Sequence, residues 1–167
     1  MKAKPVWLPE LASLAGPVDM VMRQLYAIFH RDIVHGSLKF RQAQVWWDQR
    51  PREVFGLTYE ETFWHVVSRE DKSTGIRELD VPRAERLPWC APTIRNCADP
   101  VAHVWDHVRP DGRTSTYVWL PELDYVVVLR RRPHKTGEVY FLVTAYHLDG
   151  PAERRWFEKS YAKRRAS

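Results

Sequence analysis

One histidine lies in a setting suited to proton transfer. His65 belongs to the apolar run Phe63-Trp64-His65-Val66-Val67 and is closely followed by Arg69. Partial burial would hold the imidazole in one orientation, and nearby arginines would lower its pKa. A histidine of this kind can exchange protons near neutral pH. The alternative is a structural histidine of the core with a backbone hydrogen-bond partner.

Two arginines and two hydroxyl groups are suited to binding a phosphate. Arg83 and Arg86 are three residues apart in a segment expected to be helical, so they would share one face and could hold a phosphate by charge-assisted hydrogen bonds. Thr144 and Tyr146 are two residues apart in an expected strand and would share a face with Leu142. The alternatives are a solvated or ion-paired arginine face, and a threonine that is only a good strand former.

Further basic residues are candidates for substrate binding. Arg130 ends an expected strand and shares a face with Val128, so its side chain would extend over whatever that face covers. A solvated strand end is the alternative. The other candidates in this class are Arg69, Lys159 and Lys163.

The sequence carries no metal or nucleotide motif. It lacks a glycine-rich phosphate loop, and none of its seven histidines has zincin spacing. His103 and His107 are too far apart on a strand for a simple chelate. Cys90 and Cys97 are too few for a disulfide scaffold and are expected to be reduced thiols. We expect no metal and no other cofactor.

Length and composition indicate a single domain. The 167 residues are 44% hydrophobic and 13% aromatic, which excludes a disordered chain. We find no signal peptide and no apolar run of about 18 residues that would span a bilayer, so a cytoplasmic location is expected. The net charge of +5 suits a phosphate-rich partner, and its excess lies in the first fifty and the last seventeen residues.

The hydrophobic pattern predicts an α+β domain. The chain begins with an irregular arm at 1–16 that docks through Trp7 and Leu8, followed by a helix within 17–36 and a strand before Pro51. A short helix is capped by Asp80 and ended or bent by Pro88. Four antiparallel strands follow at about 101–108, 116–120, 125–131 and 139–147, and a charged basic helix at 151–167 ends the chain.

Residues 58–69 carry conflicting signals. Thr58 and Glu61 fit a capping box, which favours a helix. The β-branched and aromatic run around His65 favours a strand. We expect a strand from Thr62, with a helix as the alternative.

Three segments together resemble one family. Phe63-Trp64-His65, the run from Arg83 to Trp89, and Tyr140-Phe141-Leu142-Val143-Thr144-Ala145-Tyr146 are similar, in this order, to the phage-type branch of the barnase–EndoU–colicin–RelE-like ribonucleases. The resemblance covers about residues 40–150, a nuclease-like core. It implies N-terminal helices packed on a curved four-stranded antiparallel sheet. Cys90 departs from the family pattern, which has a β-branched residue there.

The resemblance implies a metal-independent endoribonuclease, a toxin or effector that acts on RNA. The 2′-hydroxyl of the RNA would attack the phosphate and leave a 2′,3′-cyclic phosphate. His65 would be the general base or acid, Arg83 and Arg86 would stabilise the phosphorane, Thr144 would hydrogen-bond one of its oxygens, and Tyr146 would orient the phosphate or stack on a base. The implied partners are tRNA, mRNA or rRNA and an acidic antitoxin or immunity protein.

Two other functions fit the same residues. One is a non-catalytic RNA- or DNA-binding module in which the basic ends contact phosphates and aromatic side chains stack on bases. The other is a protein-interaction domain that binds a regulator through exposed tryptophans.

Overall fold

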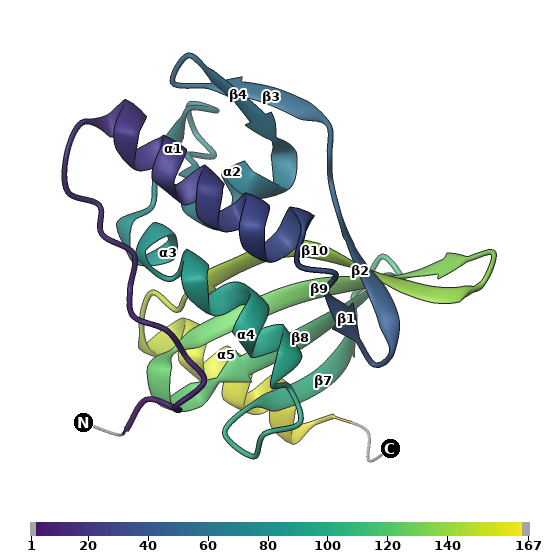
Figure 1. The fold of residues 1–167 in the computed structure, drawn as a ribbon. Coiled ribbons are helices and arrows are strands. Elements are labelled where there is room, and N and C mark those ends of the chain that lie inside the picture. The colour runs from purple at the N-terminus through teal and green to yellow at the C-terminus, as the bar shows by residue number, and fades with distance from the viewer. Residues whose placement is uncertain (1–2, 165–167) are drawn as a thin grey trace.

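The segments rich in β-branched and aromatic residues from His103 onward form four antiparallel strands, as predicted. In the computed structural model, which describes residues 3–164, these strands are consecutive neighbours in one sheet (Figure 1). They are β7 (His103–Val108), β8 (Thr114–Leu120), β9 (Tyr125–His134) and β10 (Gly137–His147). Gly112 has a φ of +81° in the first turn, a conformation that suits glycine.

Two more strands extend this sheet, so the prediction of a four-stranded antiparallel sheet is corrected. β1 (Lys39–Phe40) and β2 (Ala43–Trp47) complete a six-stranded sheet in the order β1-β2-β10-β9-β8-β7. β2 runs parallel to β10 and pairs Val45 with Tyr140, so the sheet is mixed. The backbone of β2 needs hydrogen-bond partners beside a buried Val45, and the open edge of β10 supplies them.

The sheet is curled, and an ion pair joins its two ends. Arg41 lies in the turn between β1 and β2, and its Nη1 is 3.0 Å from Oδ1 of Asp106 on β7. β1 and β7 are the first and last strands in the sheet order. The ion pair therefore links the two outer regions of the sheet.

Helices cover both faces of the sheet (Figure 1). α1 (Val18–Phe29), extended by the π-helical turn η1 (His30–Val34), confirms the predicted N-terminal helix and packs on one face with α4 (Cys90–Arg95). α5 (Pro151–Ala162) covers the opposite face through Phe157, which packs against Trp105 and Trp119. The expected final residues of this helix, 165–167, and residues 1–2 of the expected arm lie outside the described residues.

The segment around His65 is a helix, so the predicted strand from Thr62 is wrong. α2 (Glu61–Val67) lies between two small hairpins, β3–β4 (Pro51–Val54, Leu57–Glu60) and β5–β6 (Ser68–Glu70, Arg77–Leu79). Its N-cap is Glu60, without a side-chain capping bond, so the Thr58–Glu61 capping box does not form either. Five of its seven residues are buried, and tertiary packing therefore outweighs their strand propensity.

The next helix follows the predicted signals. The Asp80 side chain accepts a 3.1 Å hydrogen bond from the Arg83 backbone N–H and caps α3 (Val81–Glu85). Pro88 lies in the 3-10 turn η2 (Leu87–Trp89), which leads directly into α4. A second 3-10 turn, η3 (Pro121–Leu123), connects β8 to β9.

A β-bulge in β10 changes which side chains share a face. The pairing with β9 shifts between Leu142 and Thr144. Leu142 and Ala145 pack in the core beneath α1, whereas Tyr146 packs against the second core, beneath α5. Leu142 therefore lies on the opposite face from Tyr146, contrary to prediction, because one extra residue reverses the alternation. Thr144 and Tyr146 pair with Val128 and Val126 and share one face, as predicted.

The N-terminal arm and the two cysteines agree with expectation, whereas the hairpins β3–β4 and β5–β6 were not predicted. Leu8 of the N-terminal arm is buried, and Trp7 Nε1 donates a 2.9 Å hydrogen bond to Asp99. Cys90 and Cys97 are free thiols. No helix in residues 3–164 combines the length and apolar character needed to cross a membrane.

Candidate functional site

The imidazole of His65 is half-exposed and lies beside a carboxylate on the same helix. Its Nε2 is 3.6 Å from Glu61 Oε2, one helical turn earlier, and the side chain is 42% exposed. Arg52, on the adjacent hairpin strand β3, places its Nη1 3.5 Å from the same carboxylate oxygen. The histidine and the carboxylate are thus neighbours on an accessible face of α2.

The surroundings of His65 favour its neutral form. Burial is the largest cause that lowers the pKa of His65, and the charge of Arg77 lowers it further. Glu61 opposes this shift, whereas Arg52 and Arg83 add to it. The pKa therefore lies below its ordinary value of 6.5, and near neutral pH the imidazole is free to accept a proton.

The backbone carbonyl of His65, rather than its ring, contacts the predicted phosphate-binding residues. The Thr144 hydroxyl donates to this carbonyl at 2.8 Å, and Arg83 Nη1 donates to it at 2.8 Å as well. Arg83 Nη1 also donates to the Ser68 carbonyl at 3.1 Å and to Thr144 Oγ1 at 3.3 Å. Arg83 and Thr144 therefore fasten the end of α2 to β10 and α3.

A second, buried arginine completes this arrangement. Arg77 Nη1 donates to the carbonyls of Trp64 and Ser68 at 3.3 Å each and to Ser68 Oγ at 3.1 Å. The last carbonyls of a helix lack partners within the helix and carry partial negative charge, so two guanidinium groups satisfy and stabilise this end of α2. Arg77 and Arg52 were not predicted as site residues, and Glu61 was expected only as part of a capping box. The spacing of four between Glu61 and His65 is the signal that could have placed Glu61 beside the imidazole.

Tyr146 contacts Arg83, whereas Arg86 makes its contacts elsewhere. The guanidinium carbon of Arg83 is 5.3 Å from the centre of the Tyr146 ring, a cation–π contact. Burial is the largest cause that raises the pKa of Tyr146. Arg86 instead donates to the Pro82 carbonyl at 2.9 Å and lies over the Trp89 ring. The structure thus brings His65, Arg83, Thr144 and Tyr146 together and directs Arg86 toward Trp89.

The predicted substrate-binding residues lie in three separate places. Arg69 Nη1 pairs with Asp149 Oδ2 at 2.9 Å. Arg130 lines a hollow of about 530 Å³ at the end of the sheet. Lys159 and Lys163 line a larger hollow between α5 and β7. Arg69 still lies beside Arg83, because its Nε is 4.0 Å from Asp80 Oδ2, an oxygen that is also 3.5 Å from Arg83 Nε. Arg130 and the two lysines line separate hollows.

The hydroxyl of Thr144 provides a direct test of the anchored helix end. Thr144→Val is expected to lower the free energy of unfolding by about 1–2 kcal/mol, because the hydroxyl's bond to the His65 carbonyl and the bond it accepts from Arg83 are both lost, while Arg83 still donates to that carbonyl. Urea denaturation measures the change, and Thr144→Ser, which keeps the hydroxyl, is the control. Wild-type stability in the valine variant would show that these bonds contribute nothing.

Comparisons with known proteins give no further assignment. No protein-family model, curated protein or solved structure matches this chain. Within residues 3–164, no group of three or more His, Cys, Asp or Glu side chains is placed to hold a metal ion.

Proposed function

We propose that this protein is a metal-independent endoribonuclease. The observation that carries the proposal is the half-exposed imidazole of His65 beside the Glu61 carboxylate, with arginines close enough to lower the histidine's pKa. A neutral, accessible imidazole is suited to general-base catalysis, and positive charge around it favours a phosphodiester substrate. Perturbed titratable groups of this kind are typical of functional sites.

The reaction requires only proton transfer and charge stabilisation. His65 accepts the proton of the RNA 2′-hydroxyl as the 2′ oxygen forms a bond to phosphorus. The bond from phosphorus to the 5′ oxygen breaks, and the departing oxygen takes a proton from water. The products are a 2′,3′-cyclic phosphate and a 5′-hydroxyl. A proton on Nε2 faces Glu61, which leaves Nδ1 to act as the base.

Arg83 has a positioning role and, in this proposal, an electrostatic one. Among the described residues its hydrogen bonds all use Nη1, so Nη2 remains for a phosphoryl oxygen. Thr144 fixes the carbonyl of His65 and thereby the position of the helix turn that carries the imidazole. Preorganised groups of this kind stabilise developing charge without rearrangement during the reaction.

A substrate pair tests the nucleophile. An oligonucleotide containing a single ribonucleotide among deoxynucleotides should be cleaved at that residue, and the same oligonucleotide with a 2′-O-methyl group there should stay intact. Denaturing gel electrophoresis in EDTA resolves the products. Equal cleavage of both oligonucleotides would refute attack by the 2′-hydroxyl.

The pH dependence of cleavage should reflect the lowered pKa of His65. Because the neutral imidazole is the base, kcat/KM should rise with pH through a midpoint below 6.5. Glu61 raises this pKa, so Glu61→Gln should move the midpoint to still lower pH. Initial rates between about pH 4 and pH 8 measure both midpoints. A wild-type midpoint above 6.5 would contradict the assignment of His65 as the base.

Nucleic-acid binding without cleavage is the second candidate function. Arg83 and Thr144 bond to the backbone carbonyl of His65, so these bonds stabilise the fold and need no catalytic role. This observation favours a protein that binds RNA without cleaving it. Salt-sensitive binding of RNA that stays intact would support this second function over the first.

A further inference from the structure

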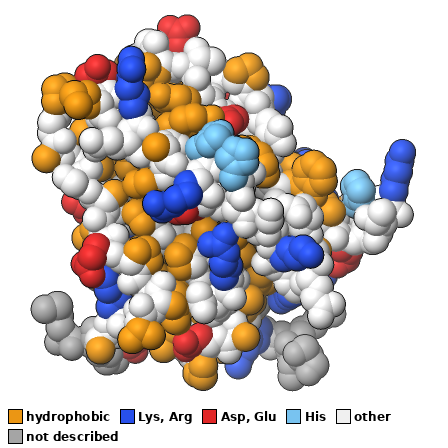
Figure 2. Space-filling view, viewed as in Figure 1, with side chains coloured by type: hydrophobic (Ala, Val, Ile, Leu, Met, Phe, Trp, Pro, Cys, Tyr) orange, Lys and Arg blue, Asp and Glu red, His pale blue; other side chains and the backbone are white. Residues whose placement is uncertain are grey.

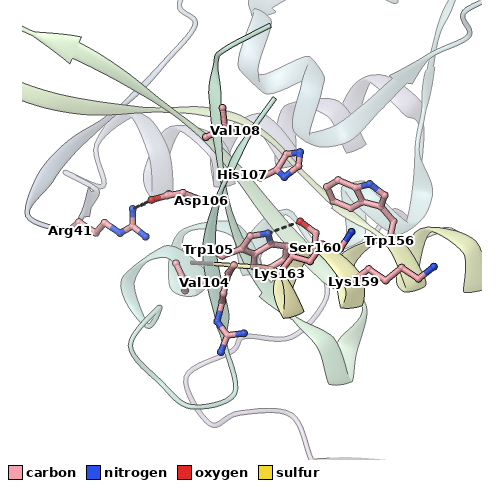
Figure 3. Close-up of a pocket in the computed structure, with 11 residues that line it drawn as sticks. Arg41, Val104, Trp105, Asp106, His107, Val108, Trp156, Lys159, Ser160 and Lys163 are labelled. Carbon is pink, nitrogen blue, oxygen red and sulfur yellow. Dashed lines mark hydrogen bonds and ion pairs between the residues drawn. The ribbon is translucent and has the colours of Figure 1, made fainter. Parts of the chain in front are cut away.

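A hollow of about 870 Å³ lies between β7 and α5, away from His65 (Figure 3). We call it the α5 groove; it is lined by residues 104–108 of β7, by Arg41, and by Trp156, Lys159, Ser160, Lys163 and Arg164. Its base is well ordered by packing: Trp105 is 3% exposed, and its Nε1 donates to Ser160 Oγ at 2.9 Å. In Figure 1, α2 lies at the top of the molecule and β7 near the bottom.

The α5 groove is strongly basic. Four of its lining residues are Lys or Arg, and Asp106 is the one acidic residue among them. Asp106 already accepts hydrogen bonds from Arg41 and from Thr116. Within residues 3–164, Lys159 and Lys163 form no ion pair. By contrast, the face shown in Figure 2 has basic and acidic side chains interspersed. The groove therefore offers two ammonium groups to an anionic ligand.

An exposed indole lies beside these lysines. Trp156 is 43% exposed, and its ring centre is 5.4 Å from that of His107, with the two planes at 78° (Figure 3). Tyr117 packs against the same indole at 5.8 Å. These edge contacts hold Trp156 in place while part of its surface remains open. An aromatic face of this kind stacks on a nucleic-acid base without sequence preference.

The groove continues into a neighbouring hollow. A second hollow of about 830 Å³ shares Arg41 and Asp106 with the α5 groove. It adds Arg131, His134 and Trp46, whose side chain is 39% exposed. Two adjoining hollows thus each place cations near an exposed indole, which suits a polymer that alternates phosphates and bases.

We infer that the α5 groove binds a single-stranded segment of RNA. Lys159 and Lys163 contact its phosphates, and Trp156 stacks on one of its bases. The choice of RNA as the ligand rests on the proposed function. The groove increases the affinity for RNA by binding a part of the strand away from the cleaved bond. The repeated pairing of cations with exposed indoles favours a nucleic-acid strand over an acidic protein.

Fluorescence anisotropy with a labelled 2′-O-methyl RNA of about 12 nucleotides tests this inference. The 2′-O-methyl groups prevent attack by the 2′ oxygen, so binding is measured separately from cleavage. Trp156→Ala should weaken binding by about 5- to 150-fold. The double substitution Lys159→Gln and Lys163→Gln should weaken it and reduce the salt slope by about 1.4, since two phosphate contacts are lost.

Arg155→Gln is the matched control, because Arg155 is an exposed cation of α5 that does not line the groove. Its affinity should stay within about twofold of wild type, and circular dichroism verifies that each variant is folded. Failure of the wild-type protein to bind the RNA, or wild-type affinity in the Trp156 and double-lysine variants, overturns the inference. Wild-type protein that cleaves RNA but does not bind the 2′-O-methyl RNA refutes only the groove's role, whereas binding without any cleavage of unmodified RNA refutes only the proposed nuclease.

Discussion

Replacing His65 with alanine is expected to lower the rate of RNA cleavage in EDTA by about 10²–10⁴-fold, the range typical for loss of a general acid or base. The imidazole is the group that accepts the proton, whereas the hydrogen bonds that fix α2 use the backbone carbonyl of His65. The substitution should therefore remove the proton acceptor and leave the hydrogen bonds to the His65 carbonyl intact. Single-turnover cleavage of total cellular RNA measures the effect without presuming a target.

Two comparisons make this result specific. His35→Ala removes an exposed histidine that follows η1 and should cleave RNA at the wild-type rate. The His65→Ala variant should also bind 2′-O-methyl RNA as tightly as wild type, because the proposed binding groove lies elsewhere. Unchanged cleavage in His65→Ala would remove this residue from the mechanism.

Replacing Trp64 with alanine is expected to lower the free energy of unfolding by about 3–5 kcal/mol. Trp64 is completely buried, and its Nε1 donates a 2.9 Å hydrogen bond to the Arg52 carbonyl. Its ring packs against Phe63 and Tyr59. The alanine variant would leave a cavity between α2 and the β3–β4 hairpin, the two elements that carry His65 and Arg52.

Trp64→Phe separates packing from hydrogen bonding at this position. Phenylalanine keeps an aromatic ring but cannot donate to the Arg52 carbonyl, so a smaller loss than in the alanine variant is expected. Urea denaturation followed by circular dichroism gives both values. A loss below about 1 kcal/mol in Trp64→Ala would contradict the tight packing of α2.

The second half of the fold could be predicted because its signals are local. Runs rich in β-branched and aromatic residues from His103 to His147 are separated by turn residues. α2 could not be predicted in this way. Five of its seven residues are buried, and its accessible face consists of Glu61 and His65 alone, so the helix is too short for its period to be recognised.

The pairing of strands that are far apart in the sequence could not be predicted either. β2 pairs in parallel with β10, a strand that follows it by about a hundred residues, and no local pattern encodes such a partner. The bulge after Leu142 is a second example. It moves Leu142 to the face opposite Thr144 and Tyr146, with which it was predicted to share a face.

The sequence predicted which residues form the candidate site better than it predicted how they contact one another. His65, Arg83, Thr144 and Tyr146 do come together, but Arg83 and Thr144 reach the carbonyl of His65. Every residue has a carbonyl, so a side-chain pattern cannot show which carbonyl accepts a hydrogen bond. Glu61 was missed as the neighbour of His65 because a strand was expected where α2 forms.

The chemical identity of the cleaved ends tests the central claim most directly. Wild-type protein incubated with total cellular RNA in EDTA should produce fragments with 2′,3′-cyclic phosphate and 5′-hydroxyl ends, which mass spectrometry identifies. These ends require attack by the 2′-hydroxyl and proton transfer of the kind proposed for His65. Fragments with 5′-phosphate and 3′-hydroxyl ends, or RNA that stays intact, would contradict the proposed function.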